Sequence, residues 1–521
     1  MQELIYPHMF LAAVEQHGKQ EAVVDGDFRA TWDEHAERVS RVCHFLAESL
    51  GVKPQDRFAV LALNGHAFFE LWHAAFMGAG VINPLNLRLA PKELAYIIED
   101  SGTEVVFVDA TFAPLVAAAR AHMKNDPIRN VILIGEGDVP HDFSYETLLA
   151  AASPEFPTPP DENDAVVLMY TGGTTGLPKG VLLEHRAEIL NIYHGAMTIP
   201  GLKIDTYLMQ TPMFHAASMF GILGAAAFGG RVVFIPMFEP EGVLKLIEEH
   251  GVTDTVMVPT MLGLCMASEG YRPERLASMK ILVYGASPMP TATLDRILKE
   301  LPDLKLVQGY GMTEGCSTAS LLLPEDHTPG NPHLSSVGKP TMGTRASIQD
   351  DDGKVLPRGE IGEVCIQGGQ IMREYWNKPE ATEEALRGGW YHTGDAGYLD
   401  EEGYLFLVDR VKDMIVTGGE NVYSAEVESA ISTFEGVAQV AVIGIPDEKW
   451  GESVHAIVVP MPGAKLTQDA IVAHARDAIA GYKIPKSVEF RDEPLPLSGA
   501  MKVLKKDLRA PYWKGKDKQI G

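Results

Sequence analysis

Short apolar runs rich in valine and isoleucine alternate with helix-like stretches over the first part of the chain, up to about residue 335. Six such runs occur in order: RFAVLAL, EVVFVD, NVILIG, DAVVLMY, RVVFIP and KILVYG. Between them lie stretches with the helical spacing of apolar residues, such as 68–76 and 291–301. Uninterrupted apolar strands are covered on both faces, and strand–helix crossovers make them parallel. The pattern predicts an α/β fold with mainly parallel sheets.

The pattern changes after this part of the chain. The segment ASIQDDDGKVLPRGEIGEVCIQG holds an Asp-Gly pair, Asp352 and Gly353, between two strand-like stretches. Such a pair favours the tight turn of an antiparallel hairpin, because both residues tolerate its backbone angles. We therefore expect a small β-rich subdomain after the parallel sheets.

A second change begins at Asp409. The sequence DRVKDMIVTGGENV places polar and charged residues beside a glycine pair, which is typical of a connection between domains. Two helix-like stretches (425–434 and 468–479) and two strand-like ones (439–443 and 454–459) follow. A chain of 521 residues also exceeds the usual size of one core. We predict a large N-terminal domain (1–408), a hinge (409–412) and a small mobile α+β domain (413–521).

Composition narrows the class of partner. The chain has 44 basic and 70 acidic residues, a formal net charge of -26. A general binder of nucleic acids or anionic membranes needs a basic surface, so neither partner is expected, and any anionic ligand must be held locally. The cysteines are far apart and show no CxxC pair, which favours a reducing compartment and buried thiols over disulfides or zinc. They are Cys43, Cys265, Cys316 and Cys365.

The sequence shows no recognisable signal for secretion, sorting or membrane insertion. The first residues, MQELIYPHMF, lack the basic and apolar regions of a signal peptide, and the last, KQIG, match no sorting tail. The most apolar window, 216–230, is shorter than the roughly 20 residues of a membrane span, so we expect a buried helix there. A cytoplasmic location without an integral membrane segment is expected, and a homodimer is left open.

The stretch YTGGTTGLPKG, residues 170–180, follows directly on the apolar run 165–169. Glycines let backbone N–H groups converge on an anion, and threonine hydroxyls add donors, so this composition favours phosphate binding. The spacing is not that of a P-loop, because Lys179 follows a proline and precedes Gly180, nor that of a GxGxxG dinucleotide site. A plain turn is the alternative for such a loop taken alone.

The loop is similar to the signature loop of the adenylate-forming superfamily, which includes acyl-CoA synthetases, luciferases and the adenylation domains of peptide synthetases. Further motifs resemble those of the superfamily and occur in its order. They are PMFH (212–215), YGAS (284–287), QGYGMTE (308–314), YHTGD (391–395), DRVKD (409–413) and SGAMKVLKKDLR (498–509). The resemblance spans most of the chain and implies an enzyme that uses ATP, Mg²⁺ and coenzyme A.

For the nucleotide, the resemblance implies three groups of contacts. The first loop would bind the β- and γ-phosphates of ATP, small residues and a tyrosine would enclose adenine, and the Asp395 carboxylate would accept both ribose hydroxyls beside Arg410. The phosphate group is Thr171, Thr174, Thr175 and Lys179, and the adenine group is Gly285, Ala286, Gln308 and Tyr310. Taken alone, Tyr310 reads as a core residue and Asp395 as the end of a turn.

For the chemistry, the resemblance implies four residues. Glu314 would bind Mg²⁺ and Thr313 the α-phosphate, although an isolated Thr-Glu pair also reads as a helix N-terminus. Lys502 would bridge the substrate carboxylate and the α-phosphate, and His215 would gate the acyl pocket. The neighbouring Lys505 and Lys506 are expected to be solvated.

The resemblance also implies two conformations of the C-terminal domain. Lys412 falls at the hinge position, and rotation would bring Gly418, Gly419 and Glu420 to a pantetheine channel. A simple domain linker is the alternative for this stretch. Val416 stands where several relatives carry a lysine that takes part in the thioester half-reaction, so no basic residue can be assigned to activating the thiol of coenzyme A. Met501 stands where glycine is common in the superfamily.

The sequence says least about which carboxylic acid is the substrate. The expected lining is apolar and partly flexible, which suits an alkyl chain or an aryl acid. It comprises Met219, Phe220, Gly221, Ala286, Met312 and Leu321. We expect an acyl-CoA synthetase for a medium- or long-chain fatty acid. The alternatives are an aryl-acid–CoA ligase, an adenylating enzyme that serves an amine or carrier protein, a catalytically silent nucleotide-binding scaffold and, remotely, a luciferase.

Overall fold

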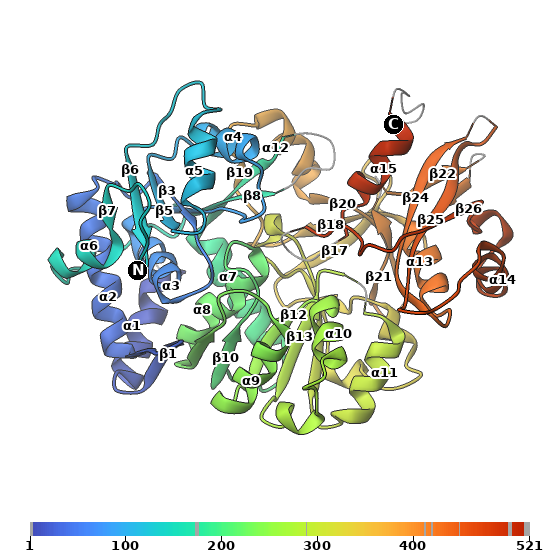
Figure 1. The fold of residues 1–521 in the computed structure, drawn as a ribbon, viewed down its shortest axis with the longest axis horizontal. Coiled ribbons are helices and arrows are strands. Elements are labelled where there is room, and N and C mark those ends of the chain that lie inside the picture. The colour runs from blue at the N-terminus through green and yellow to red at the C-terminus, as the bar shows by residue number, and fades with distance from the viewer. Residues whose placement is uncertain are drawn as a thin grey trace.

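A computed structural model of the protein describes residues 4–171, 177–287, 289–410, 413–417, 420–447, 449–498 and 503–514. The N-terminal and central parts form one large body, and the C-terminal part lies at one side of it, orange to red in the ribbon (Figure 1). The body contains two large sheets and one small one, and the C-terminal part has a sheet of its own.

The first large sheet has eight strands in the order β19-β9-β8-β4-β3-β5-β6-β7. Strands β8 to β7 in this order pair in parallel, whereas β9 and β19 are antiparallel to their neighbours. The bounds are β3 Arg57–Leu61, β4 Val81–Pro84, β5 Val105–Asp109, β6 Asn130–Ile134, β7 Phe143–Ser144, β8 Ala165–Thr171, β9 Lys179–Glu184 and β19 Glu374–Tyr375. Four of the six predicted runs are therefore strands of this sheet.

The second large sheet has nine strands in the order β16-β15-β14-β13-β12-β10-β11-β1-β2. Its strands pair in parallel from β14 to β1. The other two predicted runs, RVVFIP and KILVYG, form its strands β11 and β13. The bounds are β1 Glu21–Asp25, β2 Phe28–Thr31, β10 Thr206–Met209, β11 Arg231–Phe234, β12 Asp254–Met257, β13 Ile281–Gly285, β14 Lys305–Tyr310, β15 Ser320–Leu322 and β16 Lys339–Pro340. The prediction of mainly parallel sheets is confirmed.

Helices cover these sheets. Their bounds are α1 Tyr6–His17, α2 Trp32–His44, α3 His66–Ala74, α4 Pro91–Ser101, α5 Ala113–Arg120, α6 Tyr145–Ala151, α7 His185–Thr198, α8 Met219–Phe228, α9 Pro240–His250, α10 Pro259–Ala267, α11 Thr291–Glu300 and α12 Pro379–Ala385. Both helix-like stretches are helical, although α3 ends in a π-turn at Ala75–Ala79. The apolar window contains α8, whose side chains are mostly buried. Within the described residues, no helix combines the length and apolarity needed to span a bilayer.

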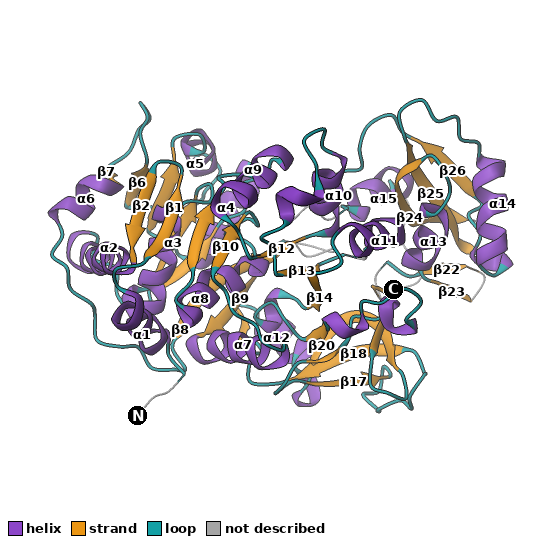
Figure 2. Cartoon of the chain, turned by 90° about the horizontal axis from the view of Figure 1, so that it is seen from below, coloured by secondary structure: helices purple, strands orange, loops and turns teal. Residues whose placement is uncertain are grey.

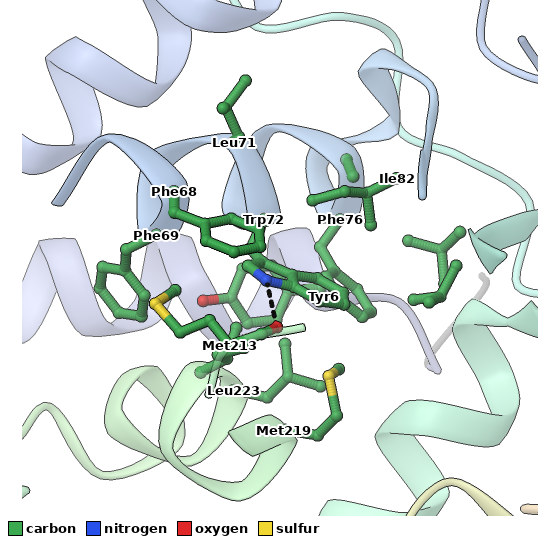
Figure 3. Packing of buried hydrophobic residues seen from close by; sticks show 14 of the residues in the cluster. Tyr6, Phe68, Phe69, Leu71, Trp72, Phe76, Ile82, Met213, Met219 and Leu223 are labelled. Atoms are coloured by element: carbon green, nitrogen blue, oxygen red, sulfur yellow. Dashed lines mark hydrogen bonds between the residues drawn. The ribbon is translucent and has the colours of Figure 1, made fainter. Parts of the chain in front are cut away.

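The largest core lies where α1, α3 and α8 meet (Figure 3). Trp72 of α3 is fully buried, and its indole N–H donates to the backbone oxygen of Met213 at 3.2 Å. This bond fixes the PMFH segment against the core, two residues before His215. All four cysteines are also buried, as expected.

The predicted β-rich subdomain is a four-stranded antiparallel sheet in the order β17-β18-β20-β21. Its strands are β17 Arg345–Gln349, β18 Gly362–Gln367, β20 Tyr391–Leu399 and β21 Leu405–Arg410. The Asp-Gly turn is present, since Gly353 adopts a positive φ of 78° and its N–H donates to the Asp350 oxygen. Figure 2 shows this sheet apart from the C-terminal strands.

In its described residues, the C-terminal part combines a sheet in the order β23-β22-β25-β24, with β26 beside β25, and the helices α13, α14 and α15. Its bounds are β22 Ile415–Thr417, β23 Glu420–Val422, α13 Ser424–Ser432, β24 Val437–Asp447, β25 Gly451–Pro460, α14 Gln468–Ala478, β26 Ser487–Phe490 and α15 Lys505–Trp513. The two predicted strands are longer than expected because β24 and β25 pair along their whole length. This α+β part has its own apolar cores.

Candidate active site

A cavity of about 1020 Å³ lies between the body and the C-terminal part. Its lining includes Thr171 at the end of β8, Gly285 at the end of β13, and Leu497, Ser498 and Val503 from the C-terminal part. In open parallel sheets, ligands bind outside the carboxyl ends of the strands. The cavity occupies that place, and the C-terminal part supplies one of its walls.

The glycine-rich stretch connects two antiparallel strands. Strands β8 and β9 pair with Thr171 opposite Lys179, so both residues lie at the end of a β-hairpin. Both side chains line the cavity. The sequence predicted the first strand but not the second, and Thr174 and Thr175 lie outside the described residues. The hairpin brings a hydroxyl and an ammonium to the same edge of the cavity.

Glu314 lies in a 3₁₀ turn, Thr313–Gly315, and not at the start of an α-helix. Glu314 and Thr313 are each only 9% exposed, and both line the cavity. The Tyr375 hydroxyl donates to Glu314 Oε1 at 2.8 Å. Lys179 Nζ lies 4.6 Å from the centroid of the same tyrosine ring. The structure thus brings the glycine-rich stretch and the GYGMTE motif together around one aromatic residue.

The predicted adenine group is divided between the cavity wall and the layer behind it. Gly285 and Ala286 line the cavity. A Cβ at Gly285 would lie 2.1 Å from the Gly309 oxygen, so the close pairing of two strands already requires glycine there. Gln308 and Tyr310 are buried behind the wall, and Gln308 Oε1 accepts from Tyr284 at 3.3 Å. Contacts of these residues with adenine stay predictions.

Asp395 is buried and accepts a hydrogen bond from the Tyr310 hydroxyl at 2.7 Å. Its backbone N–H donates to Thr393 Oγ1 at 3.1 Å. On the neighbouring strand, Arg410 pairs in register with Asp395, although its side chain is not among those described. The adenine and ribose motifs are therefore adjacent, while the contact of Asp395 with ribose stays a prediction.

The YHTGD turn is held by Glu363, a residue that sequence reasoning missed. Glu363 Oε1 accepts from the Gly394 N–H at 3.0 Å, and Oε2 lies 2.7 Å from His392 Nδ1 and 2.9 Å from an Arg387 nitrogen. Cys365 Sγ lies 3.3 Å from His392 Nδ1, and burial raises the pKa of this thiol to about 12. The ligand atoms of Glu363, Cys365 and His392 lie within 4.8 Å of one another, as in a metal site. Because Arg387 and Gly394 already engage both carboxylate oxygens, we assign the cluster to holding the turn.

Part of the remaining cavity wall is apolar. Phe220, Met312 and Leu321 line it, as predicted, together with Ile199 and His215, while the role of His215 as a gate stays a prediction. His215 Nδ1 accepts from the Ala217 N–H at 3.2 Å, which fixes the ring at the start of a 3₁₀ turn. This wall can accept an apolar acyl or aryl group.

Two lining predictions are wrong. Met219 is buried in the main core beside Leu223 (Figure 3), because its position at the start of α8 faces α3 and not the cavity. A Cβ at Gly221 would lie 2.2 Å from the Tyr207 ring, so Gly221 serves close packing of α8 on the sheet.

Arg88 connects the body to the segment that precedes Lys502. Its Nη1 donates to the backbone oxygens of Leu497 and Ser498, at 3.2 and 3.1 Å. Leu497 also forms an antiparallel bridge with Val503, which closes this segment. Lys502 itself lies outside the described residues, but the residues on both sides of its segment line the cavity.

The prediction for Lys505 is wrong. Its Nζ lies 2.6 Å from Glu428 Oε1 and donates to Ser424 Oγ at 2.6 Å, and the side chain is only 19% exposed. Burial alone would lower the pKa of this ammonium, but the carboxylates of Glu428 and Asp409 outweigh that effect and raise the pKa. Lys506 is exposed, as predicted.

The predicted hinge and thiol-channel residues fall largely outside the described residues. Lys412, Gly418 and Gly419 are among them, and only the backbone of Glu420 is described, in β23. Val416 lies in β22, and its N–H donates to Glu452 Oε2 at 3.1 Å.

Comparison with known proteins places this geometry in a family. Residues 10–376 match the model of the AMP-binding enzymes, and residues 426–502 match that of the AMP-binding enzyme C-terminal domain. Feruloyl-CoA synthase of an Amycolatopsis species is 38% identical over 493 residues, covering 94% of this chain and 96% of that protein. A fatty acid–[acyl-carrier-protein] ligase of Streptomyces coeruleorubidus is 35% identical over 491 residues, covering 93% and 92%.

Among solved structures, a fatty acyl-CoA synthetase of Mycobacterium tuberculosis superposes with a TM-score of 0.77. It is 34% identical in sequence, and the match covers 99% of each chain.

Proposed function

Because the chain belongs to the AMP-binding enzymes, as an AMP-forming acyl-CoA ligase of the adenylate-forming superfamily, we propose that it joins a medium- or long-chain fatty acid to coenzyme A. The observation that carries this proposal is the composition of one cavity. It has phosphate-type donors at Thr171 and Lys179, a carboxylate at Glu314 and an apolar wall. These are the features needed to hold ATP beside an apolar acid.

The first half-reaction forms an acyl adenylate. A carboxylate oxygen of the acid attacks the α-phosphorus of ATP, the bond to the β-phosphate breaks, and pyrophosphate leaves. Lys179 and Thr171 bind the departing phosphates, and Lys502 offsets the repulsion between the carboxylate and the α-phosphate. The chain positions the two anions, and the nucleophile is the substrate itself.

Glu314 fits the role of a magnesium ligand. A hard carboxylate oxygen beside a phosphate site is the ligand that Mg²⁺ prefers, and one or two protein carboxylates suffice because the phosphates supply further oxygens. When bound there, the ion would neutralise charge on the phosphates. Tyr375 holds Glu314 Oε1, so the carboxylate keeps one orientation toward the cavity.

The second half-reaction transfers the acyl group. The thiol sulfur of coenzyme A attacks the acyl carbonyl carbon, the bond to the AMP oxygen breaks, and the thiol proton is released. The division into domains 1–408 and 413–521, with a hinge at 409–412, would let the C-terminal domain present Lys502 in the first step and Gly418 and Gly419 in the second. His215 would separate the acyl wall from the thiol channel.

Besides an amine acceptor, two alternatives for the substrates have a named relative. An aryl acid is one, since a relative is named for feruloyl-CoA, and a carrier-protein thiol is the other, since a second relative is named for that acceptor. The apolar lining of Phe220, Met312 and Leu321 suits an alkyl chain because it holds no fixed charge.

A panel of carboxylic acids tests the proposal. Purified protein would be mixed with ATP, Mg²⁺ and each acid, with coenzyme A, an amine or a carrier protein as acceptor. AMP release and the product mass would be measured. We expect AMP and an acyl-CoA with medium- or long-chain acids. Products formed only with aryl acids, amines or carrier proteins would favour the alternatives, and no AMP with any acid would refute adenylation.

A further inference from the structure

Tyr375 contacts two residues to which the proposed function gives different roles, Lys179 for the departing phosphates and Glu314 for Mg²⁺. Its hydroxyl donates to Glu314 Oε1 at 2.8 Å, and its ring lies beneath Lys179 Nζ at 4.6 Å. We propose that Tyr375 is a positioning residue for ATP and Mg²⁺, fixing the Glu314 carboxylate through its hydroxyl and the Lys179 ammonium through its ring. This inference rests on the proposed function.

The backbone of Tyr375 is fixed between the two partner segments. Strand β19 pairs with β9, with Tyr375 opposite Val181, and the next residue, Trp376, donates its N–H to the Gly180 oxygen at 2.7 Å. On the other side, the Met372 N–H donates to the Glu314 backbone oxygen at 2.8 Å. Residues 372–376 therefore connect the strand that begins with Lys179 to the turn that carries Glu314.

The hydroxyl determines how the carboxylate is presented. Tyr375 is 7% exposed and lines the cavity, so its bond to Glu314 is shielded from most of the solvent. Holding one oxygen of a planar carboxylate fixes the direction of the other. Mg²⁺ demands near-ideal octahedral geometry, so a fixed oxygen binds it better than a rotating one.

The ring acts on the lysine. A lysine side chain has four flexible carbons, and a cation over an aromatic face is attracted by the ring. Lys179 and Glu314 contact the same tyrosine, and no salt bridge between the two is present among the described residues. Tyr375 thus keeps two opposite charges apart, so that each is presented to the ligand and not to the other.

The nearby Tyr391 supports this arrangement. It is 5% exposed, and burial together with the Glu314 and Tyr375 side chains raises its pKa well above the ordinary value. Tyr375 and Tyr391 thus both lie beside the Glu314 carboxylate on the cavity wall.

Two substitutions separate the two contacts. Tyr375→Phe removes the hydroxyl and keeps the ring, whereas Tyr375→Leu removes both. The measurements are calorimetric titration of ATP with and without Mg²⁺, and the KM and kcat of acid-dependent pyrophosphate exchange. We expect Tyr375→Phe to bind ATP without Mg²⁺ as tightly as the wild type does. The factor by which Mg²⁺ increases the affinity for ATP should be about tenfold smaller in this variant, which is the loss typical of one hydrogen bond to a charged group. Tyr375→Leu should also weaken ATP binding without Mg²⁺.

A matched control occurs elsewhere in the chain. The Tyr271 hydroxyl donates to Glu300 Oε2 at 2.7 Å, and Arg296 lies 4.9 Å from its ring centroid, but Tyr271 does not line the cavity. Tyr271→Phe removes the same kind of bond and should leave ATP and Mg²⁺ binding unchanged.

The outcomes separate this inference from the proposed function. If Tyr375→Phe keeps the full Mg²⁺-dependent gain, or if it weakens ATP binding equally with and without Mg²⁺, Tyr375 does not position Glu314. The same conclusion follows if Tyr271→Phe shows the same loss. If the wild type binds no ATP, the proposed function fails before any variant is compared. Melting temperatures of all variants show whether folding has changed, and the ring contact is tested by Tyr375→Leu in either case.

Discussion

Glu188 offers the sharpest test of the electrostatics of this fold. It lies on α7 beside the site turn, its side chain is fully buried, and among the described residues the Cys316 thiol is the one weak donor near its carboxylate oxygens. Burial raises the pKa of Glu188 to about 8, and the nearby Cys316 thiol lowers it only in part. Glu188 is therefore protonated in the folded protein at neutral pH.

The sign of the pH effect follows from this shift. The unfolded chain releases the proton near pH 4.5, the ordinary value, and the folded protein near pH 8. Between these values the unfolded state binds fewer protons, so the free energy of unfolding falls as pH rises, and outside them Glu188 has no further effect. Each pH unit in this window lowers the free energy of unfolding by about 1.4 kcal/mol. The total decrease between about pH 5 and about pH 8 is about 4 kcal/mol.

Glu188→Gln removes the titrating group and nearly keeps its shape. Urea unfolding of the full chain, followed by tryptophan fluorescence, would be measured for wild type and variant across this pH range. We expect the variant to gain about 4 kcal/mol relative to the wild type from about pH 5 to about pH 8. The exposed α1 residue Glu15 gives the control, because Glu15→Gln should show no such trend. If the difference in unfolding free energy between the wild type and the Glu188→Gln variant changes by less than about 1 kcal/mol over the range, the reasoning is refuted.

Three further predictions concern the C-terminal part. Lys502→Ala should lose most acyl-adenylate formation but still convert a supplied acyl adenylate to thioester, and an equal loss in both half-reactions would contradict two conformations of the domain. Arg88→Met removes two hydrogen bonds to the Leu497 and Ser498 oxygens, each worth about 1 kcal/mol, so pyrophosphate exchange should slow at least about tenfold; an unchanged rate would show that Arg88 does not hold the segment. Lys505→Met leaves Glu428 unpaired and should destabilise the C-terminal part by about 3 kcal/mol in urea unfolding. Adding Glu428→Leu should recover part of that loss, and no recovery would count against the ion pair as the cause.

The parallel sheets could be predicted because buried strands are written as uninterrupted apolar runs. β8 and β13 follow this rule. β19 could not be predicted, since it has two residues and exists only through its register with β9. The second strand of the glycine-rich hairpin was missed for a related reason, because Lys179 and Gly180 read as a continuation of the loop.

Motif residues could be assigned to the site because each motif has its own local composition. Contacts between segments that are distant in the sequence leave no local motif. Arg88, Glu363 and Tyr375 act through such contacts, so the sequence did not predict their roles. Charged residues also mislead. The sequence predicted a solvated Lys505, but tertiary packing pairs it with Glu428. Nothing in the sequence marks Glu188 as a residue whose side chain becomes fully buried.

The apolar wall of the cavity has an unusual origin along the chain. Ile199, His215, Phe220, Met312 and Leu321 all come from one continuous stretch, 199–321, whereas Thr171, Lys179 and Tyr375 lie on either side of it. The same stretch also contains Gly285, Thr313 and Glu314, so the acid wall and part of the nucleotide site are interleaved along the chain. A hybrid that exchanged the whole stretch between homologues would change both, whereas replacing Ile199, Phe220 and Leu321 one at a time would alter the acid range and keep the nucleotide contacts.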